Sequence, residues 1–123
     1  MSKQEDRELL ELAAKAAGYK VIGYAVTYHD YYWNGPDWGL EIEGHLGIWN
    51  PLEEDSDALK LIVELRMEVD HNQPGDKPLW VFVCTQYQRY YAFEYFDTED
   101  QRLKALRRAI VCAAALLALN NKS

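Results

Sequence analysis

The sequence predicts an α+β domain: a sandwich in which a mainly antiparallel sheet is packed by an N-terminal helix and a long C-terminal helix. Apolar residues recur with helical spacing near both ends of the chain, and they alternate with a period of two in several runs between. The predicted order is helix, two strands, helix, three strands, helix, which a layered α+β packing accommodates. With 123 residues, 49% of them hydrophobic, the chain has the size and composition of one folded domain spanning residues 1–123.

A first helix is predicted at residues 3–17. Ser2 and Glu5 have the spacing of a capping box, and Gly18 stands where a left-handed residue would end the helix. The apolar positions between them recur at intervals of three and four residues: Leu9, Leu12, Ala13 and Ala16. This periodicity is typical of one buried helix face.

Two strands and an aromatic loop are predicted next. Residues 19–28 alternate with a period of two and predict a strand buried on at least one side. Asn-Gly-Pro-Asp at residues 34–37 predicts a turn. Residues 40–43 then predict a second strand with two apolar side chains on one face and two glutamates on the other.

The second half of the chain follows a similar logic. An extended segment at residues 48–52 leads to a helix at residues 56–65 and a strand at residues 67–71. Two Pro and one Gly mark a loop at residues 72–78. A hairpin is predicted from residues 79–85 and 90–96, and the long last helix, introduced by a capping box at Thr98 and Gln101, runs to about Leu119.

The cysteines and termini indicate a reduced compartment. Cys84 and Cys112 stand among apolar residues, as buried thiols usually do. The N-terminal residues have no apolar signal region, and the longest apolar run, at residues 109–119, falls short of the ~20 residues that a spanning helix needs. We therefore expect a cytoplasmic protein without membrane contact.

Three blocks of the chain resemble one family. They are residues 7–18, the stretch Trp49-Asn50-Pro51-Leu52 that leads through Asp55-Ser56-Asp57-Ala58-Leu59 to Val63-Glu64-Leu65, and Arg107-Arg108-Ala109-Ile110-Val111 with Ala113-Ala114-Ala115. In these blocks the chain is similar to the small phage proteins of the phage ABA sandwich domain family. The resemblance implies a phage or prophage origin, hence a host-cell cytoplasm, and a layered α/β sandwich. It supplies no activity and no catalytic residue.

No pattern predicts catalysis, a metal or a cofactor. His29, His45, His71 and the two cysteines lack the spacing of zinc sites. The carboxylates at 53–57 lack the spacing of a calcium loop and are better explained as helix N-terminal residues. The chain contains no nucleophile motif and no phosphate-cradling glycine loop. We therefore expect a protein that is not an enzyme and needs no cofactor.

Charge and aromatic residues are unevenly distributed. Between Val21 and Leu59 there is no Lys or Arg, but there are eight carboxylates and seven Tyr or Trp residues. Such aromatics either fill the edge of the core or anchor a partner. The second interpretation predicts a partner-binding surface formed by Asp30, Tyr31, Tyr32, Trp33, Asp37, Trp38, Glu41, Glu43, Glu53, Glu54 and Asp55.

Together these features predict a stoichiometric protein binder. An acidic surface with aromatic anchors suits a basic partner, and a net charge of −7 disfavours direct binding to nucleic acid. In a phage, the expected role is an inhibitor of host defence, of the anti-CRISPR or another anti-defence kind, that occupies a basic nucleic-acid-binding surface. The alternative is a nucleotide-signal sponge that stacks bases on Tyr and Trp and meets phosphates with Arg89, Arg107 or Arg108. The aromatic patch could also join two copies in a homodimer.

Overall fold

A computed structural model describes residues 3–26 and 36–120 of the chain. The predicted elements are present with boundaries shifted by a few residues: α1 (Lys3–Ala16), β1 (Val21–Val26), β2 (Trp38–Ile42), α2 (Asp55–Leu65), β3 (Glu68–His71), β4 (Leu79–Cys84), β5 (Tyr91–Phe96) and α3 (Arg102–Asn120). Short 3-10 turns at Gln86–Gln88 and Glu99–Gln101 connect β4 to β5 and lead into α3. The α+β class and the long C-terminal helix are therefore confirmed.

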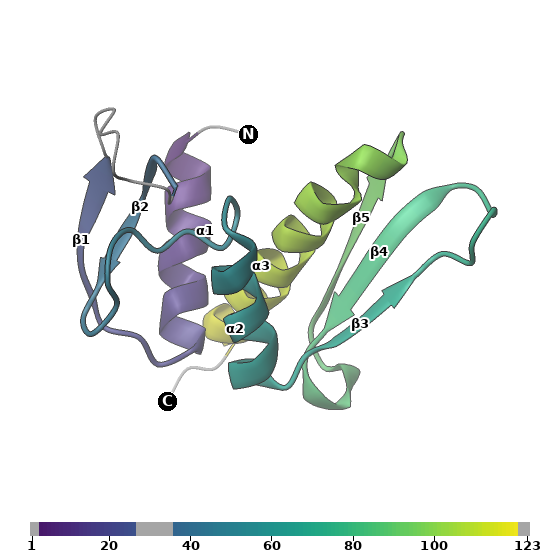
Figure 1. Cartoon of the computed structure of the whole chain (residues 1–123). Coiled ribbons are helices and arrows are strands. Elements are labelled where there is room, and N and C mark those ends of the chain that lie inside the picture. The colour runs from purple at the N-terminus through teal and green to yellow at the C-terminus, as the bar shows by residue number, and fades with distance from the viewer. Residues whose placement is uncertain (1–2, 27–35, 121–123) are drawn as a thin grey trace.

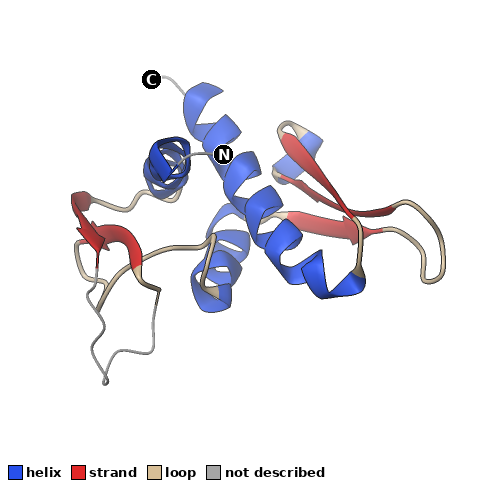
Figure 2. Cartoon of the chain, turned by 90° about the horizontal axis from the view of Figure 1, so that it is seen from above, coloured by secondary structure: helices blue, strands red, loops and turns tan. Residues whose placement is uncertain are grey.

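The strands form two sheets rather than one. An antiparallel pair, β1–β2, lies on one side of the helices, and an antiparallel sheet in the order β3–β4–β5 lies on the other (Figures 1 and 2). The expectation of one sheet covered by helices was wrong in this respect, because the helices lie between the sheets. The loop and α2 that follow β2 carry the chain from one side to the other.

Helix α3 holds the layers together because its side chains are small on several sides. Its buried residues are Ala109, Ile110, Val111, Ala113, Ala114, Ala115 and Ala118. The α1 helix presents Ala13 and Ala14, both fully buried, to the same core. Small side chains let backbones approach closely, so α3 contacts α1, α2, β4 and β5 along one length of helix.

Two helix ends have the predicted capping signals. Gly18 has φ +78°, and the N–H groups of Gly18 and Tyr19 donate to the carbonyls of Lys15 and Ala14, which is the hydrogen-bond pattern of a Schellman motif. The capping box between Thr98 and Gln101 is also present. The other predicted capping box depends on Ser2, which lies outside the described residues.

The two strands of the first sheet differ in burial. On β2, Leu40 and Ile42 are buried while Glu41 is exposed, as the alternation predicts. The β1 strand was expected to be buried on at least one side, but Val21, Ile22 and Val26 are exposed. The reason is that β1 pairs only with β2 and forms the edge of a two-stranded sheet.

Two further expectations concern the thiols and the membrane. Cys84 is buried, Cys112 is half-buried, and neither forms a disulfide. Burial raises the pKa of both thiols, and near Cys84 the Glu68 carboxylate raises the thiol pKa further. Within residues 3–26 and 36–120, no helix has the length and apolar character required to cross a bilayer.

Candidate functional site

The outer side of the three-stranded sheet carries a continuous cluster of rings. Five side chains form it: Trp80 and Phe82 on β4, and Tyr91, Phe93 and Tyr95 on β5. The Phe93 ring is central, with its centroid 4.7 Å from that of Phe82, 5.7 Å from that of Trp80 and 6.2 Å from that of Tyr95. We call these five residues the aromatic face.

Strand alternation explains why this face is uncovered. Successive residues of a strand point to opposite sides of the sheet. On β4, Leu79, Val81 and Val83 point inward and are buried beneath α3. The side chains between them point outward, where none of the described elements lies over them. The relative solvent accessibilities of Tyr91, Phe93 and Tyr95 are consequently 55%, 47% and 64%.

The charged side chains of the three strands on the side of the aromatic face are all negative. The cross-strand register pairs Glu68 with Cys84 and Asp70 with Phe82, so both β3 carboxylates lie on the same side as the rings. The strands β3, β4 and β5 contain no Lys or Arg. The nearby Arg102 is occupied elsewhere: its guanidinium donates to both Glu99 oxygens, at 2.7 and 3.0 Å, and stacks on the Phe96 ring. The surface is therefore aromatic and acidic.

The residues predicted to bind a partner are distributed differently. Asp30, Tyr31, Tyr32 and Trp33 lie outside the described residues. Trp38 is half-buried and packs against Tyr24, with the ring centroids 6.4 Å apart, so it serves the core edge.

The predicted carboxylates divide into paired and unpaired groups. Glu43 lies 3.8 Å from Lys20, and Asp55 accepts a hydrogen bond of 2.7 Å from Arg107. Glu54 is the N-cap residue of α2 and accepts a hydrogen bond from Ser56. The exposed side chains of Asp37, Glu41 and Glu53 form no hydrogen bond or ion pair with another described residue.

Two arginines considered as phosphate ligands have internal contacts. The Arg107 guanidinium donates to the Leu52 carbonyl at 2.8 Å as well as to Asp55. Arg108 contacts Asp6 at 3.3 Å and Glu94 at 3.6 Å, which connects α3 to α1 and β5. Burial raises the pKa of the Glu94 carboxyl, and the adjacent Arg108 charge opposes that rise. Both arginines lie on the helix side of the three-stranded sheet, away from the aromatic face.

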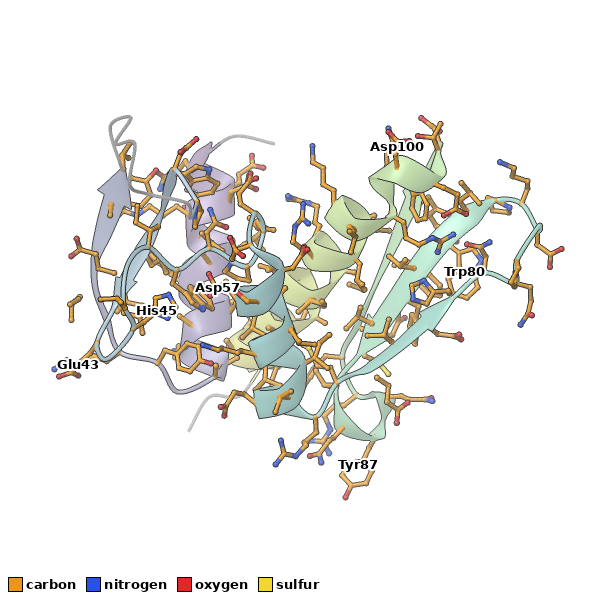
Figure 3. The ribbon with its side chains drawn as sticks, in the orientation of Figure 1. Glu43, His45, Asp57, Trp80, Tyr87 and Asp100 are labelled. Atoms are coloured by element: carbon orange, nitrogen blue, oxygen red, sulfur yellow. The ribbon has the colours of Figure 1, made fainter. Side chains whose placement is uncertain are left out.

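A second polar cluster lies between β2 and α2 (Figure 3). The Asp57 carboxylate is buried; it accepts the Asn50 backbone N–H at 3.0 Å and lies 3.9 Å from His45 Nε2. The Asn50 side chain donates to the Trp38 carbonyl and accepts the Leu52 N–H. Burial raises the pKa of Asp57, while the Asn50 N–H and His45 oppose the rise. These bonds fix the Trp-Asn-Pro-Leu turn, so we interpret this cluster as structural.

A metal centre was not expected, and the described part of the chain contains no group of three or more His, Cys, Asp or Glu side chains placed to hold an ion. The His45 and Asp57 pair has no third ligand of these types there. The chemistry available at the surface is therefore aromatic stacking and attraction of cations.

Sequence reasoning missed the aromatic face although the signal was present. The predicted hairpin at residues 79–96 has large apolar or aromatic side chains on both of its sides. In the first strand Trp80 and Phe82 alternate with Leu79 and two valines, and in the second strand three aromatic residues alternate with Ala92, Glu94 and Phe96. One helix can cover only one side of such a hairpin. The second side has to be covered by another layer or left exposed, and here it is exposed.

Comparison with known proteins returned nothing: no family model, no curated protein and no solved structure matches the chain. The resemblance to the phage family therefore stays a prediction that depends on the quoted residues.

Proposed function

We propose that this protein acts without catalysis, by binding a partner protein through its aromatic face. The observation that carries the proposal is a surface of five contiguous rings, three exposed and two half-buried, beside Glu68 and Asp70 in strands without Lys or Arg. Exposed apolar patches of this kind mark interaction sites, and aromatic residues are the usual anchors of protein interfaces.

The chemistry of the face selects a basic partner. A guanidinium or ammonium group lying over Trp80 or Phe93 gains a cation–π contact, and the β3 carboxylates can accept its hydrogen bonds. The net charge of −7 and the exposed Asp37 and Glu41 on the other sheet attract the same partner at longer range. Each of these interactions favours a partner surface with Arg or Lys and disfavours binding to a phosphate backbone.

We propose further that this partner is a host defence complex and that the protein inhibits it by occupying its basic nucleic-acid-binding surface. The support for this finer step is the resemblance to small phage proteins together with the acidic, aromatic surface. A nucleotide-signal sponge is less well supported, because Arg107 and Arg108 are engaged with carboxylates on the helix side of the sheet.

The test is affinity capture from host lysate with stepwise salt elution, using wild type, Trp80→Ser with Phe93→Ser, and Ile22→Ser as a matched exposed apolar control on the other sheet. We expect one stoichiometric partner that elutes with salt, is lost in the double variant and is retained by Ile22→Ser. Expression in a host that carries the captured system should then restore phage plating. Equal capture by all three proteins would contradict the use of the aromatic face.

A further inference from the structure

We propose that the open edge of β5 pairs with β5 of a second copy of this chain, so that two aromatic faces join into one. Such a dimer goes beyond the proposed function, because it concerns purified protein without any partner. It would place Phe93 on the two-fold axis of a continuous six-stranded sheet.

The backbone of β5 is oriented for this pairing. The Thr85 N–H donates to the Tyr90 carbonyl at 2.8 Å, which sets the hydrogen-bonding phase of the β4–β5 ladder. Because bonded pairs alternate in an antiparallel ladder, Ala92 and Glu94 bond to β4. The N–H and C=O groups of Tyr91, Phe93 and Tyr95 then point to the open side. Among the described residues, no other strand pairs with that edge.

A register centred on Phe93 satisfies these groups. Phe93 lies opposite Phe93 of the second copy, and Tyr91 of each copy lies opposite Tyr95 of the other. These three residue pairs exchange about six backbone hydrogen bonds between the chains. Every outward pair in this register is aromatic on aromatic, which is favourable across strands. The side chains that point inward pair Glu94 with Ala92, so no carboxylate faces another carboxylate.

Charge at the strand ends supports the same register. It brings the exposed Arg89, at the end of the turn before β5, near the exposed Asp97 of the other copy, just after β5, at both ends of the interface. Neither side chain has an ion-pair partner among the described residues. The surface is therefore complementary to itself.

The other two open edges are less suited. The outer edge of β3 is four residues long and includes Glu68 and Asp70, and charge on an edge strand opposes pairing. The β1 edge contains an irregularity between Val21 and Gly23, and bulged edges also resist pairing. The β5 edge has six residues, and its one charged side chain, Glu94, is matched by Arg108 within the chain.

The first test is sedimentation equilibrium of the purified full chain across a concentration series. We expect a monomer–dimer equilibrium for wild type. Phe93→Lys puts two ammonium groups at the two-fold axis and should give monomer, whereas Ile22→Lys, the same change at an exposed strand position of the other sheet, should remain dimeric. A wild-type chain that stays monomeric at every concentration overturns the proposal, as does a dimer lost in Ile22→Lys and kept in Phe93→Lys. Circular dichroism checks that each variant folds.

The second test addresses register. Arg89→Asp should weaken the dimer by about tenfold, and adding Asp97→Arg in the same chain should restore it, because the charges then complement each other again. Failure of the double variant to recover would exclude the Phe93-centred pairing even if a dimer forms. Since no partner protein is present, these results are independent of the lysate capture that tests the proposed function.

Discussion

The two sheets of this molecule are made of similar residues but bury them in opposite ways. In the β1–β2 sheet, the ring of Trp38 turns toward the core, as does that of Trp49, which bridges to Leu40 of β2, and the exposed side of β2 is acidic. In the β3–β4–β5 sheet the valines of β4 turn toward the core, and the rings turn outward. The difference shows that an aromatic residue in a strand is not by itself an anchor or a core residue. The position of the covering helix decides which it is.

The contrast is sharpest for apolar truncations. Leu40→Ala removes a fully buried side chain from the first sheet and should lower the free energy of unfolding by about 3–4 kcal/mol. Phe93→Ala removes a half-exposed ring from the second sheet and should cost less than about 1 kcal/mol. Urea unfolding of the two variants measures both values. Equal losses would mean that the aromatic face is buried in solution.

Close backbone contact is a second property of the first sheet. A Cβ at Gly39 would overlap the Trp49 carbonyl oxygen and would lie 2.7 Å from an Ile48 methyl carbon. Gly39→Ala should therefore cost about 3 kcal/mol, because the bridge between Leu40 and Trp49 must separate. Gly18→Ala, with no atom within 4 Å of its Cβ, is the control and should cost about 1 kcal/mol through its positive φ alone. Thermal unfolding distinguishes the two; similar losses would contradict the contact.

The buried Asp57 connects the first sheet to α2 and makes stability depend on pH. Asp57→Ala leaves the Asn50 N–H without an acceptor and should cost about 2 kcal/mol, whereas Asp57→Asn keeps an acceptor and should cost less. Burial raises the Asp57 pKa above its ordinary 3.8. The folded chain then binds more protons than the unfolded chain between those two pKa values.

The contribution of Asp57 to the free energy of unfolding falls as pH rises from 3.8 through its higher folded pKa. The stability of Asp57→Asn relative to that of wild type should therefore increase as pH rises through that range. Urea unfolding of both proteins over a pH series measures the difference in their free energies of unfolding. If wild type instead becomes more stable relative to the variant as pH rises, His45 and the Asn50 N–H lower the Asp57 pKa by more than burial raises it.

The smallest expected effect lies at the junction between the two halves. Arg66 ends α2 with φ 52°, and its N–H and that of Met67 donate to the carbonyls of Val63 and Ile62. A glycine adopts this left-handed conformation without cost, so Arg66→Gly should stabilise the chain by about 1 kcal/mol. Arg66→Lys, which keeps the Cβ, should give no gain. A loss of stability in Arg66→Gly would indicate that the Arg66 side chain contributes more than its backbone costs.

The elements could be predicted from the sequence because their signals are local. Gly18, the Thr98 capping box and the alternation at Leu40 and Ile42 all specify structure within a few residues. The division into two sheets and the choice of exposed side could not be predicted this way. Both depend on where α3 packs, and its residues 109–119 are all apolar, so no single apolar stripe fixes that direction.

The candidate site illustrates the same limit. Acidic and aromatic residues were grouped by nearness in sequence, and Trp38, Glu43 and Asp55 turned out to be engaged inside the molecule. The rings of the aromatic face come from two strands and become neighbours only through the β4–β5 register. A cluster assembled by cross-strand pairing is found by testing each predicted hairpin for two apolar sides.

The position of α3 in the chain has a consequence for biosynthesis. This helix lies between the sheets, yet it follows every strand in sequence, and its Arg108 bonds to Asp6 across 102 residues. During translation, the hairpin of β4 and β5 leaves the ribosome with both of its apolar sides uncovered. The nascent chain therefore passes through a stage at which the side of the hairpin that α3 later buries is still exposed to solvent, and packing of α3 against β4 and β5 ends that stage.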